Sequence, residues 1–311
     1  MFVSSSFPVP PQTMFSVALE GDKDFETCLA VAKTIDGNHF YSLHFYEHLP
    51  WRPAWSLSTA VAPYLKHIRV GPVTVPANLY SPAVNARFLA YLNTLAPGAV
   101  LGVSRGAYMG EKRAMISEVV EKVKMIVEEY SRISWRVSSE PEVYVGTSGP
   151  KLARAAASLD YVKGIVVDNL ANPRYAQYLR NILDETGRKD IQLIARPFTY
   201  IGEEMDKLLE ALWSYVPELV GDSPMLAAAG IDYRDLLAHE PSVEEKMVEN
   251  LALGGDVDAI VEKAAQLIRA GVSHICFGHP LGENPVEAVK MLRDRVVPAK
   301  SLSTLLYKRR G

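Results

Sequence analysis

The chain has 311 residues, of which 48% are hydrophobic and 22% charged, a composition typical of a soluble globular protein. Its formal net charge of −3 at pH 7 provides no basic surface field, so we expect neither nucleic acid nor a membrane as a partner. The only cysteines, Cys28 and Cys276, are far apart in the sequence and indicate neither a disulfide framework nor a zinc site.

The N-terminal segment 1–13 is rich in Ser and Pro and lacks the charged start and apolar run of a signal peptide. We expect a flexible leader over residues 1–13 and a single domain over residues 14–311. No stretch approaches the roughly 18 uninterrupted apolar residues of a membrane-spanning helix. A cytoplasmic location is therefore expected.

Short apolar strands alternate with amphipathic helices along the chain, and no hairpin turns are indicated between them. This pattern predicts parallel strands closed into a (β/α)8 TIM barrel, an α/β fold, with a doubly wound open sheet as the alternative. Residues 217–250 indicate a helical insertion in the seventh unit. The predicted strands are residues 14–19, 39–45, 67–75, 100–104, 142–145, 161–167 and 191–195, with an eighth in 273–285. The predicted helices are residues 24–34, 54–65, 82–95, 111–130, 150–159, 173–185, 202–215, 257–270 and 286–296.

Barrels of this type carry their active sites at the C-terminal ends of the strands, so the residues that follow each predicted strand form one candidate surface. These residues are Glu20, Glu47, His48, Thr74, Ser104, Arg105, the turn 146–151, Arg196 and His279. Since no His, Cys and carboxylate set shows ligand spacing, we expect no metal.

The turn Gly146-Thr147-Ser148-Gly149-Pro150-Lys151 precedes a predicted helix. Free amides and the helix dipole favour an anion at such a helix start. A plain tight turn with a capped helix explains the same residues. The position on the site-bearing face favours phosphate binding.

The pair Glu47-His48, followed by Trp51, could hold a proton donor against an aromatic wall, and Glu20 delivers a carboxylate to the end of the first strand. An isolated surface histidine more often has no function. His44 alternates within its strand, which predicts a packed interior histidine with a hydrogen-bond partner.

Two other strand ends carry features with two explanations each. Gly and Pro residues in 70–76 predict either a bulge or the close approach of a ligand. Arg105 would contact an anion or form a rim salt bridge. In the stretch 273–285, Asn284 and Pro285 begin a helix, and the preceding turn displays His279.

Several of these segments together resemble the bacterial luciferase-like superfamily of flavin and deazaflavin enzymes. The segments 46–55, 68–76 and 81–84 are similar to its second and third units, 101–106 to its fourth strand and 144–151 to its fifth. The stretch 277–285 resembles the branch that contains methylenetetrahydromethanopterin reductase. Where most relatives have Asp, this chain has Glu47, and its segment 130–142 is shorter than usual.

The resemblance implies a coenzyme across the strand C-termini, either coenzyme F-420 (8-hydroxy-5-deazaflavin) or, as the alternative, FMN. It implies a non-prolyl cis peptide near Val73-Thr74 beside the ring and phosphate contacts from the turn 146–151. Glu20 and His48 would be the catalytic acid/base or positioning groups. The coenzyme would also contact Glu47, Val73, Thr74, Ser104, Arg105, Gly278 and His279.

The predicted function is that of a deazaflavin-dependent oxidoreductase that moves a hydride between the reduced coenzyme and a small electrophilic substrate such as methylenetetrahydromethanopterin. An FMN-dependent luciferase-like monooxygenase and a coenzyme-binding paralogue without turnover are the alternatives. A homodimer or higher homo-oligomer, formed through helices of the second and third units, follows from the resemblance.

Overall fold

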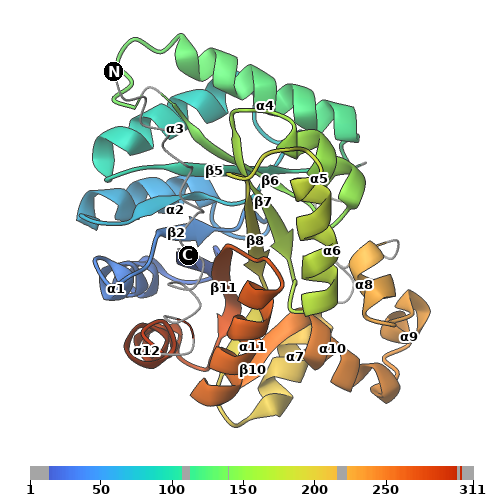
Figure 1. Ribbon diagram of the computed structural model, residues 1–311. Coiled ribbons are helices and arrows are strands. Elements are labelled where there is room, and N and C mark those ends of the chain that lie inside the picture. The colour runs from blue at the N-terminus through green and yellow to red at the C-terminus, as the bar shows by residue number, and fades with distance from the viewer. Residues whose placement is uncertain (1–13, 107–112, 139, 216–222, 300–301, 303–311) are drawn as a thin grey trace, which may run out of the picture.

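Eight parallel strand positions form the wall of a nearly closed barrel in the computed structural model, which describes residues 14–106, 113–138, 140–215, 223–299 and Leu302 (Figure 1). The strands are β1 (Met14–Leu19), β2 (Ser42–Phe45), β3 (Arg69–Pro72), β4 (Val75–Pro76), β5 (Val100–Ser104), β6 (Glu142–Gly146), β7 (Val162–Asp168), β8 (Gln192–Arg196), β9 (Phe198–Ile201), β10 (Ala252–Gly255) and β11 (His274–Leu281). Their order is β3-β2-β1-β11-β8-β7-β6-β5-β4, and a parallel bridge between Val70 and Ala99 joins the two ends. The predicted TIM barrel is therefore confirmed, and the open sheet is excluded.

Helices surround the strands on the outside of the barrel, as Figure 1 shows. Their bounds are α1 (Phe25–Ile35), α2 (Ala54–Val61), α3 (Pro82–Leu95), α4 (Ile116–Ser131), α5 (Pro150–Ala157), α6 (Pro173–Asp184), α7 (Met205–Tyr215), α8 (Pro224–Ala228), α9 (Tyr233–Leu237), α10 (Glu244–Leu251), α11 (Val257–Arg269) and α12 (Pro285–Met291). A 3-10 turn (Ala62–Tyr64) extends α2, another (Pro241–Val243) precedes α10, and a π-helical turn (Leu292–Val296) follows α12. Within the described ranges, none of the helices is long and apolar enough to cross a membrane.

Several boundaries differ from the sequence expectation, among them the start of β2, which is Ser42 rather than residue 39. The predicted helix 111–130 begins only at Ile116, because the Glu118 carboxylate accepts a hydrogen bond from the Met115 amide in a capping box. Residues 111 and 112, the leader 1–13 and residues 217–222 of the insertion lie outside the described part. The predicted strand 67–75 is divided into β3 and β4 by a cis peptide between Val73 and Thr74, as the family resemblance implied. Helix α7 begins at Met205 rather than at residue 202.

Strands β9 and β10 were not predicted. Pro197 has no amide hydrogen, so the chain leaves β8 there and continues as β9, which pairs with β10 and β11 at the rim. The seventh unit therefore combines β9, α7, the helical insertion and β10. This arrangement extends the barrel wall beyond β8.

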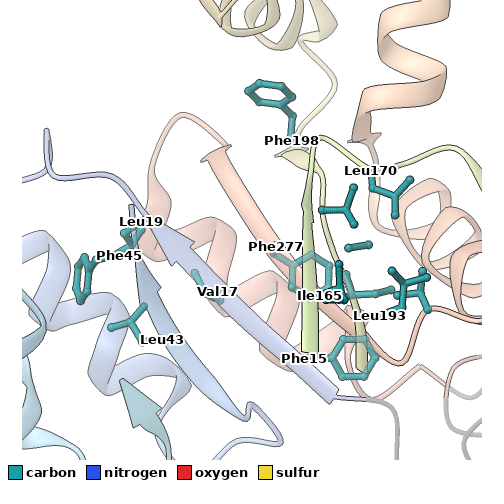
Figure 2. Close-up of a cluster of buried hydrophobic side chains, with 14 of the residues drawn as sticks. Phe15, Val17, Leu19, Leu43, Phe45, Ile165, Leu170, Leu193, Phe198 and Phe277 are labelled. Carbon is teal, nitrogen blue, oxygen red and sulfur yellow. The ribbon is translucent and has the colours of Figure 1, made fainter. Parts of the chain in front are cut away.

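Alternation along the strands divides the core into two layers. In β1, Phe15, Val17 and Leu19 point outward to the helices, where Phe15 stacks on Phe277 with a ring-centroid distance of 6.0 Å (Figure 2). Ala18 belongs to the separate inner cluster, together with Val73. Because alternate residues of each strand are buried against the helices, the residues between them point into the barrel or toward its mouth.

Polar side chains inside the barrel form a chain of hydrogen bonds that begins at His274. Its Nδ1 lies 3.3 Å from Gln192 Oε1, and its Nε2 lies 2.7 Å from Ser16 Oγ. Burial lowers the pKa of His274 to about 3, so the ring is neutral at pH 7 and carries one proton. Because an amide oxygen only accepts, that proton lies on Nδ1, and Nε2 accepts from the Ser16 hydroxyl.

The chain continues from Ser16 through β2 to β11. Ser16 Oγ lies 2.7 Å from Ser42 Oγ, which in turn lies 2.7 Å from His44 Nε2. Since Ser16 donates to His274, Ser42 donates to Ser16 and accepts from His44. Burial lowers the pKa of His44 well below its ordinary range, so its Nδ1 accepts from the Cys276 thiol at 3.3 Å. His44 is confirmed as a packed interior histidine with hydrogen-bond partners.

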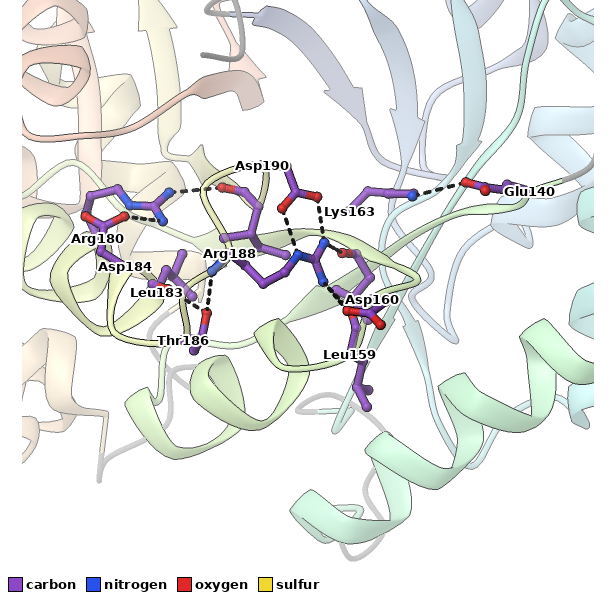
Figure 3. A network of polar contacts seen from close by, with 12 residues as sticks. Glu140, Leu159, Asp160, Lys163, Arg180, Leu183, Asp184, Thr186, Arg188 and Asp190 are labelled. Atoms are coloured by element: carbon purple, nitrogen blue, oxygen red, sulfur yellow. Dashed lines mark hydrogen bonds and ion pairs between the residues drawn. The ribbon is translucent and has the colours of Figure 1, made fainter. Parts of the chain in front are cut away.

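Arg188, in the loop before β8, ties together loops at the opposite face of the barrel (Figure 3). Its guanidinium donates to the carbonyl oxygens of Leu159 at 2.8 Å and Val162 at 3.2 Å. Two further hydrogen bonds of 2.7 Å reach the Asp190 carboxylate. The N-terminal face of such a barrel serves stability, whereas chemistry takes place at the other end.

Candidate active site

A cavity of about 460 Å³ opens at the C-terminal ends of the barrel strands. This volume lies within the usual range of small-molecule and cofactor sites. All the predicted site residues line it except Val73 and Gly278: they are Glu20, Glu47, His48, Thr74, Ser104, Arg105, Gly146, Thr147, Ser148, Gly149, Lys151 and His279. The structure thus brings these residues to one site, while their chemical roles stay predictions.

The residues predicted as an acid/base group lie on the side of the cavity formed by β1, β2 and β11. Glu20 directly follows β1, and its Oε2 lies 2.8 Å from Nδ1 of His279. Burial lowers the pKa of His48, and the nearby negative charge of Glu20 opposes that shift. The His48 ring meets Trp51 edge-on at 4.0 Å between ring centroids. The expected aromatic wall is present, and Glu20 stands between two histidines.

Glu47 has a local partner that the sequence analysis did not anticipate. Its Oε2 accepts from the Ala54 amide at 3.1 Å and from the Tyr80 hydroxyl at 3.3 Å. Helix α2 follows Pro53, which offers no side-chain cap, so Glu47 satisfies a first-turn amide in its place. Burial raises the pKa of Glu47. Its geometry explains the acidic residue as a support for the His48 loop.

The floor of the cavity rests on a buried arginine. The Arg196 guanidinium ion-pairs with Asp168, donates to the carbonyl oxygen of Val73, and lies 4.2 Å over the Tyr46 ring. Burial opposes the charge of Arg196, but Asp168 and Tyr46 more than offset this and raise its pKa, so the cation is permanent. Val73 thus lies beneath the floor and supports it rather than lining the cavity. Asp168, directly after the apolar run of β7, could have been predicted by the strand-end rule.

Gly278 also lies behind the cavity wall, contrary to the expected coenzyme contact. A Cβ atom there would approach the Pro197 carbonyl oxygen to 2.7 Å and the Tyr46 hydroxyl to 2.8 Å. Its amide donates to that same carbonyl at 3.3 Å. The position therefore requires glycine because β11 passes close to the β8–β9 corner.

The turn 146–151 lies across the cavity from the acid/base group, between β6 and α5. Thr147 Oγ1 accepts from the Gly149 amide at 2.9 Å, and Pro150 begins the helix. The exposed side chain of Lys151 and the guanidinium groups of Arg105 and Arg113 line the same region. Arg105 also donates to the Ala114 carbonyl at 2.6 Å, so its direction is held by the chain. This side of the cavity is cationic.

The seventh unit provides a wall that sequence reasoning missed. Phe198 of β9, Tyr215 of α7 and Met225 of α8 line the cavity together with Ser223. The Ser223 hydroxyl donates to Ser148 Oγ at 3.3 Å. This hydrogen bond connects the insertion to the turn 146–151. No local motif identifies these residues, because only the folding of the insertion over the barrel brings them to the site.

Comparison with known proteins identifies the family. Residues 9–274 match the family model described as luciferase-like monooxygenase. The chain belongs to the luciferase-like family. It is 23% identical over 300 residues to 5,10-methylenetetrahydromethanopterin reductase from Archaeoglobus fulgidus, over 81% of this chain and 89% of that protein. The expected resemblance to this branch is confirmed.

Two solved structures of luciferase-like proteins share the fold. Coenzyme F-420 dependent tetrahydromethanopterin reductase from Methanopyrus kandleri gives a TM-score of 0.77 at 19% identity, covering 92% of this chain and 99% of that one. The oxygenating constituent of 3,6-diketocamphane monooxygenase from Pseudomonas putida, in complex with FMN, gives 0.67 at 16% identity, covering 92% and 98%. Solved structures with this fold thus include one described as dependent on coenzyme F-420 and one in complex with FMN.

The residues of this site fit such a coenzyme. At Gly146, a Cβ atom would come within 2.6 Å of the Thr74 side chain, so the absence of a side chain lets the floor close beneath a flat ligand. Lys151 and the neighbouring arginines would hold the phosphate, and Thr74 and Ser104 would contact the ring side. The bound coenzyme would supply the hydride chemistry.

Proposed function

We propose that this luciferase-like protein is a deazaflavin-dependent oxidoreductase that transfers a hydride between reduced coenzyme F-420 and a small electrophilic substrate. Methylenetetrahydromethanopterin is the first substrate to test, since a reductase of that compound is similar over most of both chains. The expected partners are therefore small molecules.

The observation that carries the proposal is the division of the cavity into two chemically different sides. Glu20, His48 and His279 line the side at β1, β2 and β11, whereas Lys151 and Arg105 line the side at β5 and β6. An anionic tail would bind at the cationic side, which leaves the reactive ring over the floor near the acid/base group. Trp51, Phe198 and Tyr215 restrict the remaining space and would exclude water from the reacting atoms.

Fluorescence titration of the apo protein with coenzyme F-420 tests the proposal. We expect saturable binding that weakens in Lys151→Ala and is unchanged in Lys189→Ala, a control lysine far from the cavity lining. Consumption of the reduced coenzyme in the presence of methylenetetrahydromethanopterin would then establish the reaction. Absence of F-420 binding by the folded wild-type protein would refute the proposal.

An FMN-dependent monooxygenase is the second candidate, favoured by the shared fold of the FMN-bound 3,6-diketocamphane monooxygenase component. Gel filtration after incubation with F-420 or FMN separates the two proposals, because only the proper coenzyme should co-elute. Co-elution of FMN together with oxygen consumption would favour the monooxygenase. Tight F-420 binding without hydride transfer to any pterin or alcohol would favour a non-catalytic coenzyme-binding paralogue.

We also propose a homo-oligomer formed through the second and third units. Exposed Val84, Phe88 and Tyr91 follow one another at helical spacing on one face of α3, which supports this expectation. Sedimentation velocity would measure the state directly. Replacement of Phe88 and Tyr91 by Glu should then produce monomers that keep the fold.

A further inference from the structure

The contact between Glu20 and His279 bears on which group handles the proton. The parallel register of β1 and β11, with Val17 opposite Phe277, brings the ends of the two strands to the same height. Glu20 directly follows β1, and its side chain is 4% exposed, whereas that of His279 is 19% exposed. Both residues line the cavity, and of the two His279 has the more exposed side chain.

The 2.8 Å separation of Glu20 Oε2 and His279 Nδ1 determines where the ring carries its proton. An ionised carboxylate can only accept, so Nδ1 must donate to it. Nε2 on the other side of the ring then carries a lone pair when the ring is neutral and a proton when it is charged. Nε2 makes no hydrogen bond to any residue in the described ranges.

The surroundings orient the ring as well. The Tyr215 ring packs on His279 with a centroid distance of 5.4 Å, and Tyr215 lines the cavity beside it. With the Glu20 carboxylate at Nδ1 and the tilted Tyr215 ring beside it, Nε2 is the ring nitrogen that no residue of the described ranges occupies. The same logic orients the histidine of catalytic triads, in which the carboxylate selects the tautomer.

We propose that His279 Nε2 is the group that exchanges a proton with the ligand in the cavity, and that Glu20 is its positioning residue. This inference rests on the proposed hydride transfer. Of the two roles expected for Glu20, acid/base or positioning, it assigns the second, and it gives the proton exchange to His279, which was expected only as a coenzyme contact. His48 is also close enough to Glu20 to sense its charge, but burial lowers the pKa of His48 and favours its neutral form.

The proton balance of the proposed reaction requires such a group. A hydride from the reduced deazaflavin forms a new C–H bond at the electrophilic carbon, and the electron pair of the broken carbon–nitrogen bond goes to nitrogen. That nitrogen takes a proton from protonated Nε2, and the ring regains one from the coenzyme, which loses a hydride and a proton. The substrate is reduced by two electrons and the deazaflavin is oxidised by two.

Long-range ¹H–¹⁵N correlation spectra of the histidine rings test the orientation without any coenzyme. We expect wild-type His279, assigned by loss of its signals in His279→Gln, to carry its proton on Nδ1 in the neutral form. Glu20→Ala removes the acceptor and should return His279 to the Nε2–H tautomer, while the exposed-histidine control His67→Gln leaves it unchanged. An Nε2–H tautomer in the wild-type protein, or no change in Glu20→Ala, would overturn the proposal.

Kinetics with reduced F-420 and methylenetetrahydromethanopterin test the role. His279→Ala should lower kcat by about 100-fold with little change in KM, Glu20→Ala should lower it by a similar factor, and the double variant should be no slower than either. Multiplicative losses in the double variant would show independent roles and contradict the proposal. If the wild-type protein does not bind F-420, only the proposed function is refuted. The spectra need no coenzyme, so they still test the pairing of Glu20 with His279.

Discussion

The same three strands, β1, β2 and β11, carry two polar groups with opposite properties. Inside the barrel, Ser16, His44 and His274 are fully buried and belong to one chain of hydrogen bonds, in which Ser42 links His44 to Ser16. At the mouth, Glu20 and His279 meet each other beside an open cavity. Histidine occurs in both groups, and its surroundings differ because the two groups lie at different depths along the strands.

The period of two along a β-strand explains this arrangement. Ser16, Ala18 and Glu20 occupy alternate positions of β1 and the residue after it, so the inward side of one strand runs from the interior to the cavity. Inside the barrel, the side chains are fully buried, and burial favours hydrogen bonds between uncharged groups. At the mouth, Glu20 and His279 lie beside the cavity, where a ligand could supply further hydrogen-bond partners.

Removal of an interior histidine should produce the largest change in stability. His44→Ala removes one hydrogen bond each from Ser42 and Cys276 and opens a cavity, so we expect a loss of about 3 kcal/mol in unfolding free energy. The matched change at the mouth, His48→Ala, should cost less than about 1 kcal/mol. Urea unfolding of both variants measures this contrast. Equal losses of unfolding free energy in His44→Ala and His48→Ala would contradict the distinction between the interior and the mouth.

The interior histidines should also make stability depend on pH. The folded pKa of His274 is about 3, below the ordinary value of 6.5, so below pH 6.5 the unfolded chain binds a proton that the folded chain does not. This contribution is complete above pH 6.5 and is lost as the pH falls toward 3, by about 2 kcal/mol between pH 6.5 and 5. Urea unfolding at several pH values in this range measures the free energy of unfolding. That free energy should depend less steeply on pH in His274→Asn than in the wild-type protein. Identical slopes would contradict neutral burial.

A change at the cationic side of the mouth should have the smallest effect and should spare stability. Lys151 is exposed, so Lys151→Ala should leave the unfolding free energy within about 0.5 kcal/mol. Loss of one charge from the phosphate contacts should weaken F-420 binding by about tenfold at low ionic strength, and less at high salt. Titration at two salt concentrations measures both effects. A salt-independent loss would argue against an electrostatic contact.

Much of the barrel could be predicted because its determinants are local. The bounds of β1, α3 and β5 agree with the expected ranges, since each is a periodic apolar segment with clear boundaries. The rim strands β9 and β10 could not be predicted, because their pairing with β11 depends on the path of the chain after Pro197. The wall formed by Tyr215 and Met225 was missed for the same reason.

The sequence by itself predicted the fold class and most of the polar side chains at the mouth, because both follow from strand periodicity and from the rule that sites lie at strand C-termini. Only the tertiary structure decided what each polar residue contacts. It assigned Glu47 to the start of α2 and joined Glu20 to His279 through the pairing of the first and last strands. Partners distant in sequence are selected by barrel closure and burial, and no local pattern records them.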